Sequence, residues 1–162
     1  MGDNNKKVED SKQLLIFKLG EEEFGVDILQ VKIIEKLDQE ITRVPKAPVF
    51  VEGVINLRGD IIPIVDLRKR FGLTTRPLGY DTRVIIVEIN NSQVGMMVDS
   101  VSEVLRIDAA DVEEAPKITK GVDAVYINGV AKTNDRLIII LNLDRALSAE
   151  EAKELKEMNM NA

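Results

Sequence analysis

The chain has 162 residues, of which 44% are hydrophobic and only 4% aromatic, so its core must be built mainly from Val, Ile and Leu, which favours strands. Cysteine and histidine are absent, which excludes disulfides, thiolate nucleophiles, sulfur-ligated zinc and any imidazole base or phosphoacceptor. The net charge of −6 argues against a nucleic-acid partner, and no run approaches roughly 20 apolar residues, so we expect a soluble cytoplasmic protein without membrane insertion.

The N-terminal half of the sequence predicts short strands joined by turns. Residues 1–13 are polar and charged and are expected to form a flexible N-terminal segment. Apolar and polar residues then alternate, a pattern typical of half-buried strands. Strands are expected at 15–19, 24–26, 31–35, 51–57 and 61–65, with a proline-containing loop at 42–48. Asp66 is expected to cap a short helix over 67–71.

The C-terminal half also consists mainly of predicted strands. Residues 73–82 contain proline and glycine without periodicity, so we interpret them as the connection between halves. Strands are expected at 84–87, 94–98, 101–107, 124–132 and 136–143, and the acidic stretch 108–123 is expected to be irregular surface. A capping box at Ser148-Ala149-Glu150-Glu151 predicts a helix that opens a C-terminal segment, 148–162.

Parts of the two halves resemble each other. A shift of 76 residues takes Gly53 and Val54 onto Gly129 and Val130, and takes the apolar positions of 62–67 onto those of 138–143. A shift of 70 residues takes Gly25 onto Gly95. The alternative to a duplication is two unrelated sheets. With a duplication, each half has about five short strands, which is enough for a small closed barrel without exposed edges.

Candidate sites for chemistry are few. The carboxylates of Glu21, Glu22, Glu23 and Asp27 could form a metal cluster, but charge is expected in a turn and no EF-hand spacing follows. The segment 53–59 lacks the Gly-Lys-Ser/Thr ending of a phosphate loop. An enzyme based on lysine and aspartate, or a carboxylate-based hydrolase, is the alternative from another class. We therefore predict no metal, no cofactor and no catalysis.

Arg58 is the residue most suggestive of binding. It is expected at the tip of a strand turn beside Gly59, where a guanidinium projects and offers several donors to a partner. An ordinary solvated turn arginine is the other interpretation. The local sequence does not decide between these two roles.

The segment 52–68, Glu-Gly-Val-Ile-Asn-Leu-Arg-Gly-Asp-Ile-Ile-Pro-Ile-Val-Asp-Leu-Arg, is similar to the signature of the CheW family of bacterial chemotaxis coupling proteins. The resemblance continues at 24–28, 94–101 and 136–144 and covers nearly all of 14–147. It implies a mainly β fold of two five-stranded SH3-like barrels packed side by side, followed by the short C-terminal helix. The barrels would comprise about 14–72 and 83–143, and strand exchange between them is possible.

The resemblance also implies a function and partners. Members of this family join the cytoplasmic tips of methyl-accepting chemotaxis receptors to the regulatory domain of a histidine autokinase, and they have no activity of their own. The expected protein is a monomer by itself and becomes part of receptor arrays attached to the membrane. Two related possibilities are the kinase's own regulatory domain and the front half of a coupler fused to a receiver domain. We expect a freestanding coupler, because the fold starts near the N-terminus and ends in a short helix.

Site residues follow from the same resemblance. Arg58 matches the family's turn arginine, associated with receptor contact, and Val31 matches another interface position, so receptor binding is expected at Arg58, Val31, Ile33 and Glu35. Kinase binding is expected at Gly53 and Gly59. One position departs from the family pattern: many members carry glutamate where this chain has Ile33. Because side chains alternate along a strand, Glu35 is expected on the same face and could substitute.

Overall fold

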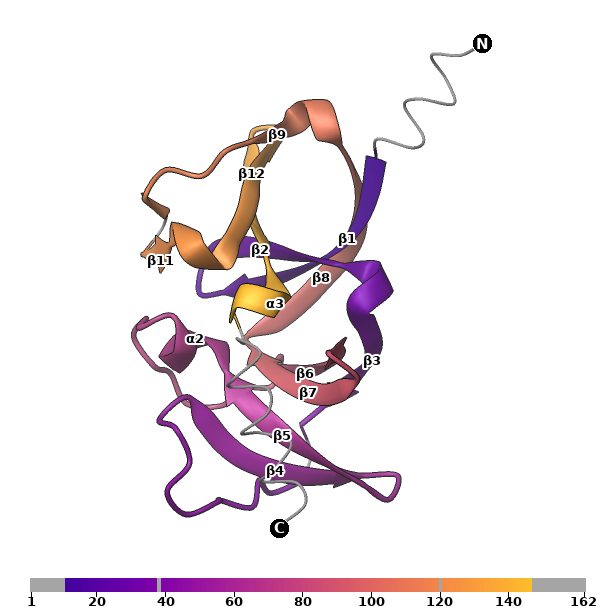
Figure 1. Ribbon diagram of the computed structural model, residues 1–162, viewed down its shortest axis with the longest axis vertical. Helices are drawn as coiled ribbons and strands as arrows, with labels where there is room; N and C mark the ends of the chain where they lie inside the picture. The colour runs from indigo at the N-terminus through magenta and orange to yellow at the C-terminus, as the bar shows by residue number, and fades with distance from the viewer. Residues whose placement is uncertain (1–10, 38, 120, 147–162) are drawn as a thin grey trace.

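The computed structural model describes residues 11–37, 39–119 and 121–146, which fold into two main sheets with short helices between them (Figure 1). The strands in the first half are β1 (Ser11–Leu19), β2 (Glu22–Asp27), β3 (Val31–Lys36), β4 (Val51–Leu57) and β5 (Asp60–Asp66). Those in the second half are β6 (Arg83–Ile89), β7 (Ser92–Val98), β8 (Ser100–Asp108), β9 (Val112–Glu113), β10 (Ile118–Thr119), β11 (Val122–Asp123), β12 (Ile127–Thr133) and β13 (Arg136–Leu141). The helical elements are η1 (Ile28–Gln30), α2 (Leu67–Arg70), η2 (Ala109–Asp111), η3 (Ala124–Tyr126) and α3 (Leu143–Ala146).

The two halves of the chain exchange hairpins. The upper sheet in Figure 1 has the order β8-β1-β2-β13-β12-β9, and the lower sheet has the order β3-β6-β7-β5-β4. The hairpin β1–β2 therefore completes the sheet of the second half, and β6–β7 completes the sheet of the first. The division into 14–72 and 83–143 separates the sequence repeat but does not separate the barrels. Apolar alternation sets which face of a strand is buried and leaves its partner strand open.

The internal repeat is confirmed by strand register. Ile64 of β5 lies opposite Gly95 of β7 in a parallel pair, and Ile140 of β13 lies opposite Gly25 of β2 in another. The hairpins β4–β5 and β12–β13 both have a register irregularity, at Gly53 in the first and at Gly129 in the second. These equivalences reproduce the shifts of 76 and 70 residues in the sequence.

Each sheet closes into a barrel because the chain that follows one edge strand pairs with a strand at the opposite edge. In the lower sheet it runs from β3 to β4, and in the upper sheet from β8 to β12. After β3, Thr42 pairs with Val54 of β4 through backbone hydrogen bonds of 2.8 and 2.9 Å. After β8, the short strand β9 pairs with Val130 and Ala131 of β12. Closure satisfies backbone groups at edges that would otherwise lie open to other strands. The SH3-like two-barrel architecture expected from the sequence is consistent with this topology.

The core has three parts. Each barrel has its own aliphatic cluster, and a larger cluster between the barrels is shared by both sheets. In this shared core, Phe24 stacks between Phe17 and Phe71, with ring centroids 5.7 and 6.3 Å away. Burial of so much aliphatic surface between the sheets fixes the two barrels as one unit.

Some boundaries differ from those expected. Strand β1 starts at Ser11, so residues 11–13 belong to the sheet and not to the N-terminal segment. The stretch 108–123 contains η2 and three two-residue strands: β9 pairs with β12 and closes the upper barrel, while β10 and β11 pair with each other. Residues 124–126 form η3, and Leu143 begins α3 instead of ending a strand. Residues 1–10 and the helix expected from 148 lie outside the described residues.

Candidate interaction surface

The β4–β5 hairpin carries Arg58 at its tip. Arg58 has φ 54° and its side chain is 73% exposed. Its Nη2 lies 3.9 Å from Oε1 of Glu35 on β3, whose side chain is 31% exposed. The turn itself is held by Asn56, whose Oδ1 accepts a hydrogen bond of 3.1 Å from the Gly59 N–H. Two residues predicted from the sequence to bind the same partner, Arg58 and Glu35, are thus neighbours in space.

Strand β3 presents Val31, Ile33 and Glu35 on its less exposed face. These three are partly buried, while the residues between them are exposed. A register irregularity separates Val31 from Ile33, and the two side chains pack against different clusters. Val31 lies against the shared core and Ile33 against the core of the lower barrel. The structure therefore brings Glu35 to Arg58 and leaves Val31 at the junction of the barrels.

Gly53 is buried inside the lower barrel, unlike Gly59. It has φ 146°, and a Cβ placed on it would lie 2.1 Å from the carbonyl oxygen of Thr42. No real Cβ atom tolerates such an approach to backbone, so glycine is required where Thr42 closes the barrel. Gly59 has φ 90° and open space around its Cβ position. Kinase binding at these two glycines stays a prediction, and only Gly59 offers an accessible position for testing it.

An apolar strip that sequence reasoning missed lies beside Val31. Ile28 of η1, Val31 and Val101 of β8 are all partly buried against the shared core. Leu29, which follows Ile28, is 89% exposed, and Val104, further along β8, is 48% exposed. We call Ile28, Leu29, Val31, Val101 and Val104 the edge strip, because they lie on η1, β3 and β8, the segments at the two points where the chain passes from one sheet to the other. No local sequence pattern distinguishes Leu29 from a buried aliphatic residue, so the sequence offered no signal for this strip.

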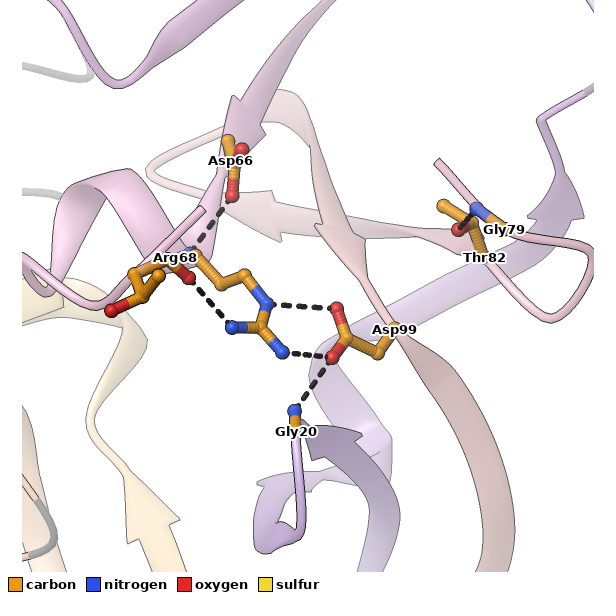
Figure 2. Close-up of polar contacts among 7 residues, drawn as sticks. Gly20, Asp66, Arg68, Gly79, Thr82 and Asp99 are labelled. Carbon is orange, nitrogen blue, oxygen red and sulfur yellow. Dashed lines mark hydrogen bonds and ion pairs between the residues drawn. The ribbon is translucent and has the colours of Figure 1, made fainter. Parts of the chain in front are cut away.

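A second feature missed from the sequence is the ion pair between Arg68 and Asp99 (Figure 2). Arg68 Nε donates to Asp99 Oδ1 at 3.0 Å, and Nη2 donates to Oδ2. The Gly20 N–H donates to the same Oδ2 at 2.6 Å, and Arg68 Nη1 donates to the carbonyl of Thr74 at 2.7 Å. A bidentate guanidinium–carboxylate pair of this kind is both strong and directional.

Asp99 and Asp66 have pKa values shifted in opposite directions. Partial burial acts to raise the pKa of Asp99, but hydrogen bonds from Arg68 and Gly20 outweigh it and the pKa is lowered. Burial raises the pKa of Asp66, and the backbone N–H groups of Arg68 and Lys69 offset this only in part. Asp66 caps α2, accepting from the Arg68 N–H at 2.9 Å.

Asp66→Asn should therefore raise stability slightly at neutral pH. Asparagine keeps the capping acceptor and removes the cost of a buried charge, so we expect a gain of about 0.5–1 kcal/mol. Because the folded-state pKa is raised, wild-type Asp66 takes up a proton as pH falls, and the gain should shrink on acidification. Urea unfolding at several pH values measures this. The matched control is Asp123→Asn, which alters the exposed cap of η3, and a loss of stability in Asp66→Asn alone would contradict the expectation.

In the part of the chain that the structure describes, no three His, Cys, Asp or Glu side chains are grouped to hold a metal ion. None of the helices in residues 11–37, 39–119 and 121–146 is long and apolar enough to cross a bilayer.

Comparison with known proteins agrees with this geometry. A family model described as a CheW-like domain matches residues 13–151. The chemotaxis protein CheW of Treponema pallidum is 36% identical over 150 residues, which cover 90% of this chain and 88% of that protein. The chemotaxis protein CheW of Klebsiella aerogenes is 39% identical over 142 residues, covering 86% and 84%. The scaffolding protein TtCheW from Thermoanaerobacter tengcongensis has a solved structure with TM-score 0.79 and 44% identity, covering 86% of this chain and 94% of that one.

The fold is that of a double-barrel β protein, in which two closed barrels exchange hairpins. Arg58 stands at the tip of one hairpin. The known proteins match this chain over most of its length, both in amino-acid sequence and in three-dimensional structure. The chain therefore belongs to the CheW-like family.

Proposed function

We propose that this chain is a chemotaxis adaptor that couples the cytoplasmic tips of chemoreceptors to the regulatory domain of a histidine kinase. It acts without catalysis of its own, in the cytoplasm, and is recruited to receptor arrays at the membrane. The names of its relatives support the chemotaxis role, since these are chemotaxis proteins and one is called a scaffolding protein.

The observation that carries the receptor half of this proposal is the edge strip together with the Arg58–Glu35 pair. Half-buried aliphatic side chains on η1, β3 and β8 provide a surface on which an apolar helix face buries area. The exposed guanidinium of Arg58 has donors left to pair with a partner carboxylate. Each such contact is weak alone, and an array strengthens it because geometry sets a high effective concentration.

Arg58→Glu should weaken receptor binding without harming the fold. The 3.9 Å contact with Glu35 is exposed and adds at most about 1 kcal/mol to stability. Reversing the charge should lower affinity for a receptor-tip fragment by about tenfold, because an attractive contact with a partner carboxylate becomes a repulsive one. Calorimetry with a chemoreceptor cytoplasmic fragment measures the change.

The matched control is Lys132→Glu. Lys132 lies in the β12–β13 hairpin, the equivalent of the Arg58 hairpin, and pairs with Glu113 at 3.0 Å on an exposed surface. Lys132→Glu changes the net charge by the same amount as Arg58→Glu and should leave receptor affinity unaltered. Equal affinity of wild type and folded Arg58→Glu would count against the assigned surface.

The kinase half of the proposal is tested at Gly59. Asparagine tolerates positive φ better than other side chains, and space around the Gly59 Cβ position is open. Gly59→Asn should therefore keep the fold and lower affinity for the kinase regulatory domain several-fold by crowding the interface. Unchanged kinase affinity in light scattering of the mixture would remove Gly59 from the kinase site.

A further inference from the structure

The chain passes from one sheet to the other at two crossings, and the two are held differently. Between β2 and β3 the crossing is η1, where Asp27 accepts a local hydrogen bond of 3.0 Å from the Leu29 N–H. Between β7 and β8 the crossing is the single residue Asp99. Its carboxylate is bound by Arg68 and Gly20, as Figure 2 shows. One crossing is thus a short-range cap and the other a long-range anchor.

The anchor at Asp99 joins four separate segments. Arg68 follows β5 in the lower sheet, and Gly20 lies in the β1–β2 turn of the upper sheet. The Arg68 guanidinium also binds the carbonyl of Thr74 in the connection between halves. The backbone N–H of Asp99 donates to the carbonyl of Lys18 at 3.1 Å. Any rotation of one barrel against the other would break several of these contacts together.

The crossings set the spacing of the edge strip. Strand β8 starts directly after Asp99 and carries Val101 and Val104, while β3 starts directly after η1 and carries Val31. Val31 and Val101 pack against the same shared core from the first strands of different sheets. The distance between Val31 and Val101 therefore depends on how firmly the chain is held at Asp99, where it leaves the lower sheet and enters β8.

We propose that Arg68 and Asp99 are positioning residues that fix β8 relative to β3 and so preset the edge strip for its helical partner. This inference rests on the proposed function, because the strip is the surface assigned there to receptor tips. The Arg68 side chain is only 8% exposed, so its guanidinium fork holds the carboxylate with little competition from water. Neither residue needs to touch the partner.

The test is a conservative change, Arg68→Lys, which keeps the charge and loses the bidentate fork. The matched control is Arg136→Lys. Arg136 donates to the single oxygen Oε2 of Glu23 through Nε and Nη2, at 3.0 and 2.8 Å, and its Nη2 also donates to Glu103 of β8 at 3.3 Å. These contacts join β13, β2 and β8 within the upper sheet and span no crossing, so the control loses guanidinium hydrogen bonds without touching the anchor.

Spacing is measured directly by spin labels. The chain has no cysteine, so Lys32→Cys on β3 and Ser102→Cys on β8, both exposed, accept labels at these two sites alone. Double electron–electron resonance should give a narrow distribution of the distance between the two labels in the parent and in Arg136→Lys. In Arg68→Lys the distribution should be broadened or shifted. Asp99→Asn, which keeps the shape of the side chain, provides a second variant should Arg68→Lys fail to fold.

Affinity of the unlabelled variants for a chemoreceptor cytoplasmic fragment completes the test. Arg68→Lys should bind roughly twofold to thirtyfold more weakly, the range for residues that act on a site through structure. An unchanged distance distribution would overturn the proposal, since the pair would then only stabilise the fold. Unchanged affinity despite altered distances would overturn it too. If wild type fails to bind the receptor fragment, the proposed function fails, and the labels still decide whether the pair fixes the strands.

Discussion

Gly53→Ala should destabilise the protein more than the same change at Gly59 or Gly129, the glycines of comparable hairpin positions. The new Cβ would meet the carbonyl oxygen of Thr42 at 2.1 Å and its carbonyl carbon at 2.7 Å. Both are backbone atoms of the segment that closes the lower barrel, so relief requires breaking the Thr42–Val54 bridge. With the strain of φ 146° added, we expect a loss of at least about 3 kcal/mol in the free energy of unfolding.

Two glycines give the controls for this result. Gly59→Ala has positive φ but open space, so it should cost only about 1 kcal/mol. Gly129→Ala, at the equivalent place in the upper barrel, would meet mainly Cγ1 of the Val112 side chain and should be intermediate. Urea unfolding of all three measures the order. Similar values for Gly53→Ala and Gly59→Ala would contradict the close approach of Thr42. A receptor or kinase binding defect in any Gly53 variant must be interpreted with this cost in view.

Arg68→Met should have the second large effect. Removing the guanidinium leaves the Asp99 carboxylate with the Gly20 N–H but without its cation, and unpairing a largely buried ion pair costs about 2–4 kcal/mol. Asp99 is 31% exposed, so water reaches it in part and keeps the cost below that of a fully buried charge. Chemical unfolding at neutral pH measures the loss.

The same pair predicts a pH dependence. Because hydrogen bonds from Arg68 lower the folded-state pKa of Asp99 below the unfolded value, the pair adds stability at higher pH. That contribution should disappear as pH falls below the ordinary carboxyl range and through the lowered pKa of Asp99. The stability difference between wild type and Arg68→Met should therefore shrink in that range. A difference independent of pH would mean that packing, and not the charge, accounts for Arg68.

The strands were largely predictable because each barrel is built from short alternating segments. The hairpins around 15–26, 51–65 and 84–98 follow directly from period-two patterns and turn residues. The repeat linking Gly53 to Gly129 also predicted two equivalent hairpins, and glycine within a strand is a known signal of close backbone approach. Such local signals do not identify which strands pair: the family resemblance left strand exchange open, and the structure shows it as the exchange of two hairpins.

The candidate surface was predictable only in part. Family resemblance indicated Arg58 and Glu35, and the structure places them 3.9 Å apart. Leu29 and Val104 were missed because an exposed aliphatic residue in a β-rich chain has the same local pattern as a buried one. Arg68 and Asp99 are 31 residues apart, so no sequence spacing links them. Their pairing depends on the crossing between sheets.

The central claim is that this chain bridges two partners, and a bridging assay tests it most directly. Receptor cytoplasmic fragments from the same organism are immobilised, and the kinase regulatory domain is added with and without the chain. We predict that the kinase domain is retained only when the chain is present, and that Arg58→Glu, but not Lys132→Glu, strongly lowers retention. Failure of the wild-type chain to bind either partner at tens of micromolar, or equal retention of the kinase domain without it, would contradict the account.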